Sequence, residues 1–141
     1  MVAARRNHLV DTIRPALDRG EWVVCDRFAD STLAYQGYGR GLPREALDAL
    51  HALIAGDFKP DLTVILDVPV DVGLSRVAKR ANGGNRFEQM GREFHERLRR
   101  GFQEIARADP NRCVLIDATA ELTAVQQAIR AAVRARLGVA I

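Results

Sequence analysis

Three short apolar runs punctuate this chain, and longer amphipathic stretches separate them. The runs cover residues 22–25, 62–66 and 114–116, and each is apolar on both faces. Runs of this kind are typical of strands buried inside a parallel sheet. The pattern therefore predicts three strands over these ranges.

Helical spacing of apolar residues fills most of the chain between and around these runs. It predicts helices over residues 3–19, 44–55, 70–80, 88–107 and 121–136. Pro15 lies inside the first helix and is expected to loosen it around Asp11 and Thr12. Gly20 is expected to end that helix. Strands that alternate with helices imply an α/β fold with a parallel sheet and right-handed crossovers.

Composition narrows the function classes without naming one. The chain has 141 residues, enough for one domain with a core, and a net charge of +3. Its basic residues are spread along the sequence, so we expect no nucleic-acid partner. No apolar run is long enough for a membrane span. Cys25 and Cys113 stand apart without a Cys/His cluster, which predicts reduced thiols, no metal site and a cytoplasmic location.

Asp26 and Arg27 follow directly after the first predicted strand. Ligands of open α/β sheets bind beyond the carboxyl ends of the strands. A guanidinium there matches the geometry of a phosphate group, and the adjacent carboxylate can hold the guanidinium or a water molecule on Mg²⁺. Taken alone, this dipeptide favours an ordinary strand-to-loop ion pair, because Asp-Arg dipeptides are common.

A longer string around this dipeptide carries more information. Asp26-Arg27-Phe28, followed by Ser31-Thr32 and Ala34-Tyr35-Gln36-Gly37, resembles the bacterial thymidylate kinases. The resemblance covers nearly all of the chain. It implies a P-loop kinase-type fold of three layers, in which residues 1–141 form one domain corresponding to the C-terminal two-thirds of the family. It also implies transfer of the γ-phosphoryl group of ATP to dTMP, with Mg²⁺ as cofactor and a homodimer as the assembly.

The same resemblance assigns residues to the dTMP site. Arg27 would bind the phosphate and Asp26 would orient it. Tyr35 would lie against the sugar and exclude ribonucleotides, although a half-buried tyrosine commonly just packs. The remaining base contacts would come from Arg5, from Thr32 or Ser31 beside it, and from Gln36. Met1 stands where the family places a phenylalanine that stacks on thymine.

A second group of residues would serve ATP and the transfer step. Residues 81–90 resemble the lid of these kinases, with Arg76, Arg80 and Arg86 around it and Glu88 as an acid near the substrate. Asn85 departs from the aspartate of the family pattern. Asp117-Ala118-Thr119 resembles the loop that borders adenine, although Thr119 could equally be the N-cap of the last helix.

One element of the family is not in the sequence. A phosphate-binding loop of the form Gly-x-x-x-x-Gly-Lys-Ser/Thr does not occur, because the chain has no Gly-Lys pair. We therefore expect an incomplete fold in which the first strands and the P-loop are absent, and a chain that is inactive alone. The missing strand is expected between residues 22–25 and 62–66, so that two apolar edges would be exposed. A non-catalytic remnant and another deoxynucleoside or nucleotide kinase are the alternatives.

Overall fold

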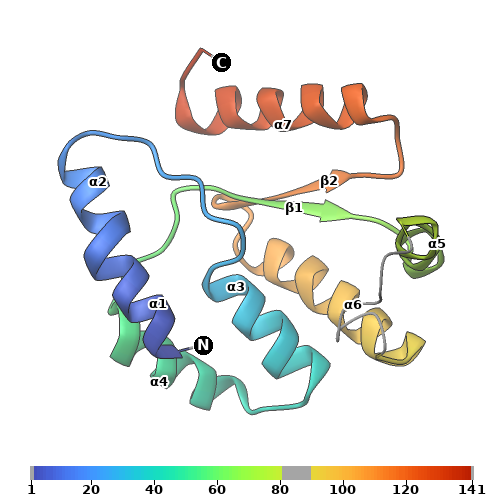
Figure 1. Ribbon diagram of the computed structural model, residues 1–141, viewed down its shortest axis with the longest axis horizontal. Coiled ribbons are helices and arrows are strands. Elements are labelled where there is room, and N and C mark those ends of the chain that lie inside the picture. Colours follow the sequence, from blue (N-terminus) through green and yellow to red (C-terminus); the bar gives the residue numbers. More distant parts are fainter. Residues whose placement is uncertain (1, 81–89, 141) are drawn as a thin grey trace.

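A two-stranded parallel sheet forms the middle layer of the computed structural model, which describes residues 2–80 and 90–140. Strand β1 (Thr63–Asp67) pairs with β2 (Cys113–Asp117), and Thr63 lies opposite Cys113. Helix α7 (Leu122–Leu137) covers one face of the sheet, and α6 (Arg92–Ala108) lies on the other (Figure 1). The three-layer α/β architecture with a parallel sheet is thus confirmed.

Alternation along the strands sends side chains into both outer layers. Val64 and Ile116 pack toward α7, where Val125 completes a buried cluster. Ile65 and Cys113 point the other way, into the core formed with α6. A strand with apolar residues on both faces is stable only when both faces are covered, which explains why the runs at 62–66 and 114–116 lack a polar face. Both strands were predicted to within one residue at each end.

The predicted strand at 22–25 is wrong. Residues 21–25 connect two helices without forming a strand, and the side chains of Trp22 and Val24 are 65% and 96% exposed. A buried strand needs a hydrogen-bonded neighbour along its edge. Among the described residues, β1 pairs only with β2, so no strand is available beside residues 21–25.

The first helical region is a single rod with an irregular middle. It comprises α1 (Val2–His8), a π-helical stretch η1 (Leu9–Ile13) and α2 (Arg14–Asp18). The irregular stretch contains Asp11 and Thr12, where Pro15 was expected to loosen the helix. Proline has no N–H to donate and its ring displaces the carbonyl four residues earlier, which favours a widened turn. Gly20 follows with a φ of 75° and ends the rod, as predicted.

A second helical rod carries most of the predicted substrate residues. It consists of α3 (Ala29–Thr32) and a π-helical stretch η2 (Leu33–Gly39), and α4 (Arg44–Ala55) follows it. Two glycines let this rod lie directly on α6. A Cβ on Gly39 would come within 2.7 Å of the Phe94 ring, and one on Gly101 within 2.5 Å of Tyr38. Arg97 fastens the end of η2 by donating to the carbonyl of Gly39 at 3.2 Å.

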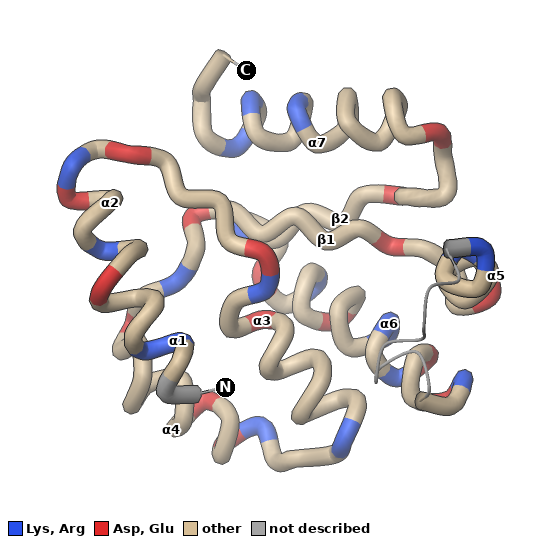
Figure 2. Tube along the Cα trace, in the orientation of Figure 1, with Lys and Arg blue, Asp and Glu red and all other residues tan. Residues whose placement is uncertain are grey.

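The remaining helix, α5 (Val70–Arg80), follows β1 and precedes α6 in the crossover to β2. Basic and acidic residues are interspersed along the helices rather than gathered into one run (Figure 2). None of the described helices combines the length and the apolar character needed to cross a membrane.

Candidate functional site

Arg27 lies in a bend between the irregular residues 21–25 and α3. Its backbone has a φ of 65°, the one positive value among the described residues other than glycine. For an L-residue this left-handed conformation costs about 1–2 kcal/mol, so the surrounding contacts must hold it. The guanidinium carbon of Arg27 lies 5.3 Å from the centre of the Tyr35 ring. The structure therefore brings together the two residues on which the predicted phosphate site depends.

Tyr35 also packs against α6. Its ring centre lies 6.3 Å from that of Phe94 and 6.4 Å from that of Phe102, the latter edge to face. Contacts of this kind fix the plane of an aromatic ring. A cation above the ring face is attracted by the π electrons, by about 0.5–1 kcal/mol at an exposed site. Arg27 is exposed, so its charge remains available to a ligand.

Ser31 and Thr32 occupy different surroundings although they are adjacent. Ser31 precedes Tyr35 by one helical turn and is half-buried. The Thr32 side chain is 8% exposed, and its Oγ1 has no hydrogen-bond partner in the described part of the chain. Gln36 is half-buried in η2, and its backbone carbonyl accepts a hydrogen bond from Leu42 at 2.9 Å.

Thr32 lines a cavity of about 270 Å³ that lies against α3 and α4. Arg5, another predicted base-binding residue, lines the same cavity, whereas Arg27 and Tyr35 do not. Both ring nitrogens of His51 are buried there, and the described residues offer neither a hydrogen-bond partner. Buried polar groups without partners are uncommon and mark a place where a water molecule or a ligand can bind. The sequence analysis gave His51 no role. The cavity walls include Leu33, Leu47, Leu50, Ile54 and Ile105.

Arg5 reaches the residue that follows Arg27. It donates a hydrogen bond to the carbonyl of Phe28 at 3.2 Å, and its guanidinium carbon lies 5.5 Å from the centre of the Phe28 ring. Burial lowers the pKa of Arg5 relative to a free arginine, although the group stays charged at neutral pH. Phe28 also packs edge to face on Phe58, with ring centres 6.0 Å apart.

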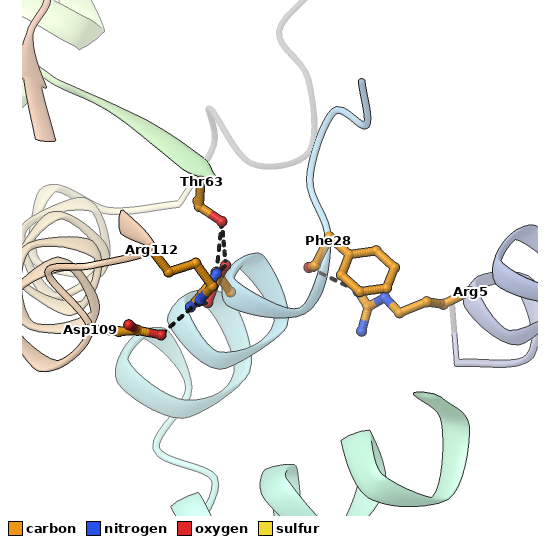
Figure 3. A network of polar contacts seen from close by, with 6 residues as sticks. Arg5, Phe28, Thr63, Asp109 and Arg112 are labelled. Carbon is orange, nitrogen blue, oxygen red and sulfur yellow. Dashed lines mark hydrogen bonds and ion pairs between the residues drawn. The ribbon is translucent and has the colours of Figure 1, made fainter. Parts of the chain in front are cut away.

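A partly buried ion pair begins two residues after Phe28, and Figure 3 shows Arg112 at its centre with Thr63 and Asp109 beside it. Asp30, in the first turn of α3, accepts hydrogen bonds from Arg112 at 2.7 and 2.8 Å. Thr63 donates to the same carboxylate at 3.0 Å, and Asp109 holds the Nε of Arg112 at 2.8 Å. Burial alone would raise the pKa of Asp30, but the bonds and charge of Arg112 outweigh it and leave that pKa lowered. Sequence analysis missed this network: Asp30 lies inside the string at 26–37 but was given no role, and its partners lie in no motif.

Two carboxylates mark the carboxyl ends of the paired strands. Asp67 accepts two bonds from Arg99 at 2.8 Å and one from Gln103 at 3.2 Å. These contacts lower the pKa of Asp67, the Arg99 bond most strongly. Asp117 accepts bonds from the backbone N–H and the hydroxyl of Thr119 at 2.8 and 2.7 Å, which lowers its pKa. Asp67 was seen only as a strand end from the sequence.

Arg76 reaches the predicted adenine loop from α5. It donates to the carbonyls of Ala118 at 2.8 Å and Thr119 at 3.3 Å. The structure therefore joins three of the residues predicted for ATP, although α5 and the loop are far apart in sequence. The alternative role of Thr119 as a helix N-cap is wrong, because Glu121 occupies that position before α7.

Several predicted residues lie outside the described part of the chain. These are Met1, Asn85, Arg86, Glu88 and the lid range apart from Met90; the side chain of Arg80, the last residue of α5, is likewise outside it. Asp26 is exposed, and no hydrogen bond or ion pair joins it to Arg27 in the described structure. No group of three or more His, Cys, Asp or Glu residues within residues 2–80 and 90–140 is arranged to hold a metal ion.

Comparisons with known proteins agree on one family. The family model described as "Thymidylate kinase" matches residues 1–129. The thymidylate kinase of Caulobacter vibrioides is 55% identical over 138 residues, which are 98% of this chain and 66% of the relative. That of a Bradyrhizobium species is 50% identical over 141 residues, 99% of this chain and 62% of the relative. The crystal structure of the Ehrlichia chaffeensis enzyme superimposes with a TM-score of 0.72 at 34% identity, covering 94% of this chain and 61% of that one. The chain thus spans slightly less than two thirds of these relatives.

Proposed function

Because this chain belongs to the thymidylate kinase family, we propose that it takes part in transferring the γ-phosphoryl group of ATP to dTMP, giving dTDP. Within that reaction the chain supplies the acceptor side, which binds dTMP, and a loop for the adenine of ATP. The relatives of this chain are longer than it is, and the chain spans 66% of the Caulobacter kinase and 62% of the Bradyrhizobium kinase.

The observation that carries the proposal is the placement of Arg27 above the Tyr35 ring, 5.3 Å from its centre. A nucleotide that lies along this ring would present its 5′ phosphate to the guanidinium, which can bind two phosphate oxygens at once. The ring would then stand against the sugar, where a 2′-hydroxyl group would meet it. This arrangement favours a deoxynucleoside monophosphate over a ribonucleotide.

Other residues are candidates for binding the base of dTMP and the adenine of ATP. Arg5 and the unpartnered Thr32 hydroxyl line one cavity and offer hydrogen bonds to the edge of a base, and Ser31 and Gln36 are further candidates. The loop of Asp117, Ala118 and Thr119, which Arg76 fastens, is the candidate for contact with adenine. Arg80, Arg86 and Glu88 stay predicted lid residues.

The phosphates of ATP have no binding loop in this sequence, which contains no Gly-Lys pair. Asp26 is the candidate carboxylate for the Mg²⁺ that accompanies ATP, but the described residues do not assemble a metal site around it. We therefore assign no step to the metal. A homodimer is proposed from the family resemblance alone.

The test separates acceptor binding from transfer. Titration calorimetry of the 141-residue chain with dTMP, and with the ribonucleotide that carries thymine, measures the acceptor side. We expect dTMP to bind at least about tenfold more tightly than the ribonucleotide, a difference of about 1.4 kcal/mol. Equal binding of both, or of neither, contradicts the proposed acceptor site.

A second measurement follows ADP release from ATP and dTMP. We expect no turnover by this chain alone, and turnover once the chain is joined to the part of the Caulobacter kinase that it does not span. Binding of dTMP without turnover by either protein would favour the alternative of a non-catalytic nucleotide-binding domain. A preference for another nucleotide in a panel would favour a different kinase of the same group.

A further inference from the structure

The turn that contains Arg27 is held only weakly by the residues before it: Val23 and Cys25 pack against the apolar cluster around Leu9 and Phe28, and the Cys25 thiol donates a long hydrogen bond to the Arg27 carbonyl at 3.8 Å. Residues 21–25, which precede it, form no strand, and Val24 is almost fully exposed. The residues that follow it are fastened at two successive points. Phe28 is held by Arg5 and Phe58, and Asp30 is held by Arg112. The left-handed backbone of Arg27 therefore depends in large part on contacts made by residues 28–30.

Arg112 makes the stronger of these two attachments. Its guanidinium binds both carboxylate oxygens of Asp30, the hydroxyl of Thr63 and the carboxylate of Asp109, at 2.7 to 2.8 Å. The Arg112 and Asp30 side chains are 15% and 14% exposed, so water screens the pair little. Arg112 directly precedes β2 and Thr63 begins β1, which means that the sheet itself anchors the first turn of α3.

A buried ion pair adds little net stability compared with an apolar pair of the same shape, and such pairs are better known for fixing one arrangement among several. Here the arrangement that the pair fixes is the start of the rod that carries Ser31, Thr32 and Tyr35. Arg27 lies three residues before Asp30, within the same turn of chain. Because Phe94 and Phe102 hold Tyr35 separately, a local shift of Asp30 at the start of the rod would move Arg27 relative to Tyr35.

We propose that Asp30 and Arg112 are positioning residues for the acceptor site, and that their ion pair holds the Arg27 guanidinium above Tyr35 where it meets the phosphate of the nucleotide. Both residues line the cavity that Thr32 and Arg5 also line, but neither is assigned a contact with the phosphate in this scheme. The inference rests on the proposed function for its ligand, but its geometric part concerns the free chain and can be tested without any ligand.

The first experiment measures the free chain by NMR. Protons of the Arg27 side chain are shifted upfield by the Tyr35 ring as long as the two groups stay in contact. Asp30→Asn removes the charge from the pair with little change in shape. We expect this variant, and Arg112→Lys, to lose most of the upfield shift while circular dichroism shows a folded chain. Glu21→Gln is the matched control, because it removes the same charge from an exposed carboxylate that binds Arg19 through two hydrogen bonds.

The second experiment compares dTMP with thymidine, which lacks the phosphate. For Asp30→Asn we expect the Kd for dTMP to rise about tenfold and the Kd for thymidine to change by less than about twofold, because a single charge-assisted phosphate contact is weakened. A purely structural role would weaken both ligands equally or neither. Glu21→Gln should leave both affinities unchanged.

The outcomes are distinguishable. A folded Asp30→Asn chain that keeps the Arg27 shift and its dTMP affinity overturns the inference. If the original chain binds no dTMP, the proposed function fails, and the NMR shift alone decides the inference.

If Asp30→Asn is unfolded, Thr63→Val takes its place, because it removes one hydrogen bond to Asp30 and keeps the ion pair. We then expect partial loss of the shift, and an unchanged shift overturns the inference.

Discussion

The Arg27 guanidinium covers the Tyr35 ring although Arg27 precedes α3 and Tyr35 lies in η2. The contact spans the length of α3 and gives the exposed arginine a defined direction. Phe94 and Phe102 of α6 contact the same ring, so the position of the cation depends on packing between η2 and α6. The proposed acceptor site and the core of the domain therefore share this one aromatic side chain.

Replacing Tyr35 tests this link. In Tyr35→Ala the cation loses its ring, worth about 0.5–1 kcal/mol, and Arg27 gains freedom that a ligand must remove. We expect the Kd for dTMP to rise about fivefold or more, as measured by calorimetry. Tyr35→Phe keeps the ring and is expected to stay within about twofold of the original chain. Equal affinities for the Ala and Phe variants would contradict a role for the ring.

How far the sequence predicts this fold depends on what each element needs. The runs at 62–66 and 114–116 were confirmed as strands because each is the other's neighbour in the sheet. The strand predicted for the equally apolar run at 22–25 is wrong, because a strand needs a pairing partner that the local sequence does not supply. Helices depend on local spacing and caps, and those over 44–55 and 70–80 agree with the structure.

The candidate site divides in the same way. Arg27 and Tyr35 belong to one continuous motif, and the structure brings them together. Asp30 and Arg112 are far apart in sequence, and no periodicity connects them, so only the folded chain reveals their contact. An arginine directly before a buried strand was the one available signal, and it does not name its partner.

Acid is expected to destabilise the domain partly through Asp67. Its pKa is lowered in the folded chain, chiefly by the bond from Arg99, below the unfolded value of about 3.9. A carboxylate with a lowered folded pKa contributes stability above the unfolded pKa, and this contribution is lost as pH falls through the folded pKa. The free energy of unfolding in urea should therefore fall less steeply between about pH 5 and about pH 2 in Arg99→Gln than in the original chain.

Asp67→Asn provides the control for this measurement. It removes the titrating group, so adding Arg99→Gln to it should not change the pH dependence further. A ¹³C titration of the Asp67 carboxyl group reports its pKa directly. An unaltered Asp67 titration in Arg99→Gln would show that the ion pair is not the cause.

Because η2 packs closely on α6, a side chain at Gly101 is expected to be destabilising. Alanine usually stabilises a helix interior by up to about 1 kcal/mol relative to glycine. At Gly101, however, the added Cβ would lie 2.5 Å from Tyr38 Cγ and 2.6 Å from its Cβ, so a rigid part of the side chain must move. We expect Gly101→Ala to lower the free energy of unfolding by about 1–3 kcal/mol in urea melts.

Gly73 is the matched position in α5. A Cβ there would meet only Val68 at an ordinary 3.5 Å, so Gly73→Ala should leave stability unchanged or raise it slightly. A Gly101→Ala chain as stable as Gly73→Ala would mean that η2 does not lie against α6 as described.

Substitution of Val24 tests whether residues 22–25 join the sheet when the missing part of the kinase is present. Its side chain is 96% exposed in this chain, so Val24→Ser should change the free energy of unfolding by less than about 0.5 kcal/mol. Ile65→Ala, in the buried face of β1, should cost about 2–5 kcal/mol under the same conditions. In this chain joined to the part of the Caulobacter kinase that it does not span, a strand between residues 22–25 and β1 would bury Val24. There we expect Val24→Ser to cost at least about 1 kcal/mol. An equally small effect in both proteins would show that residues 22–25 remain outside the sheet, and that the expected central strand does not pair with them.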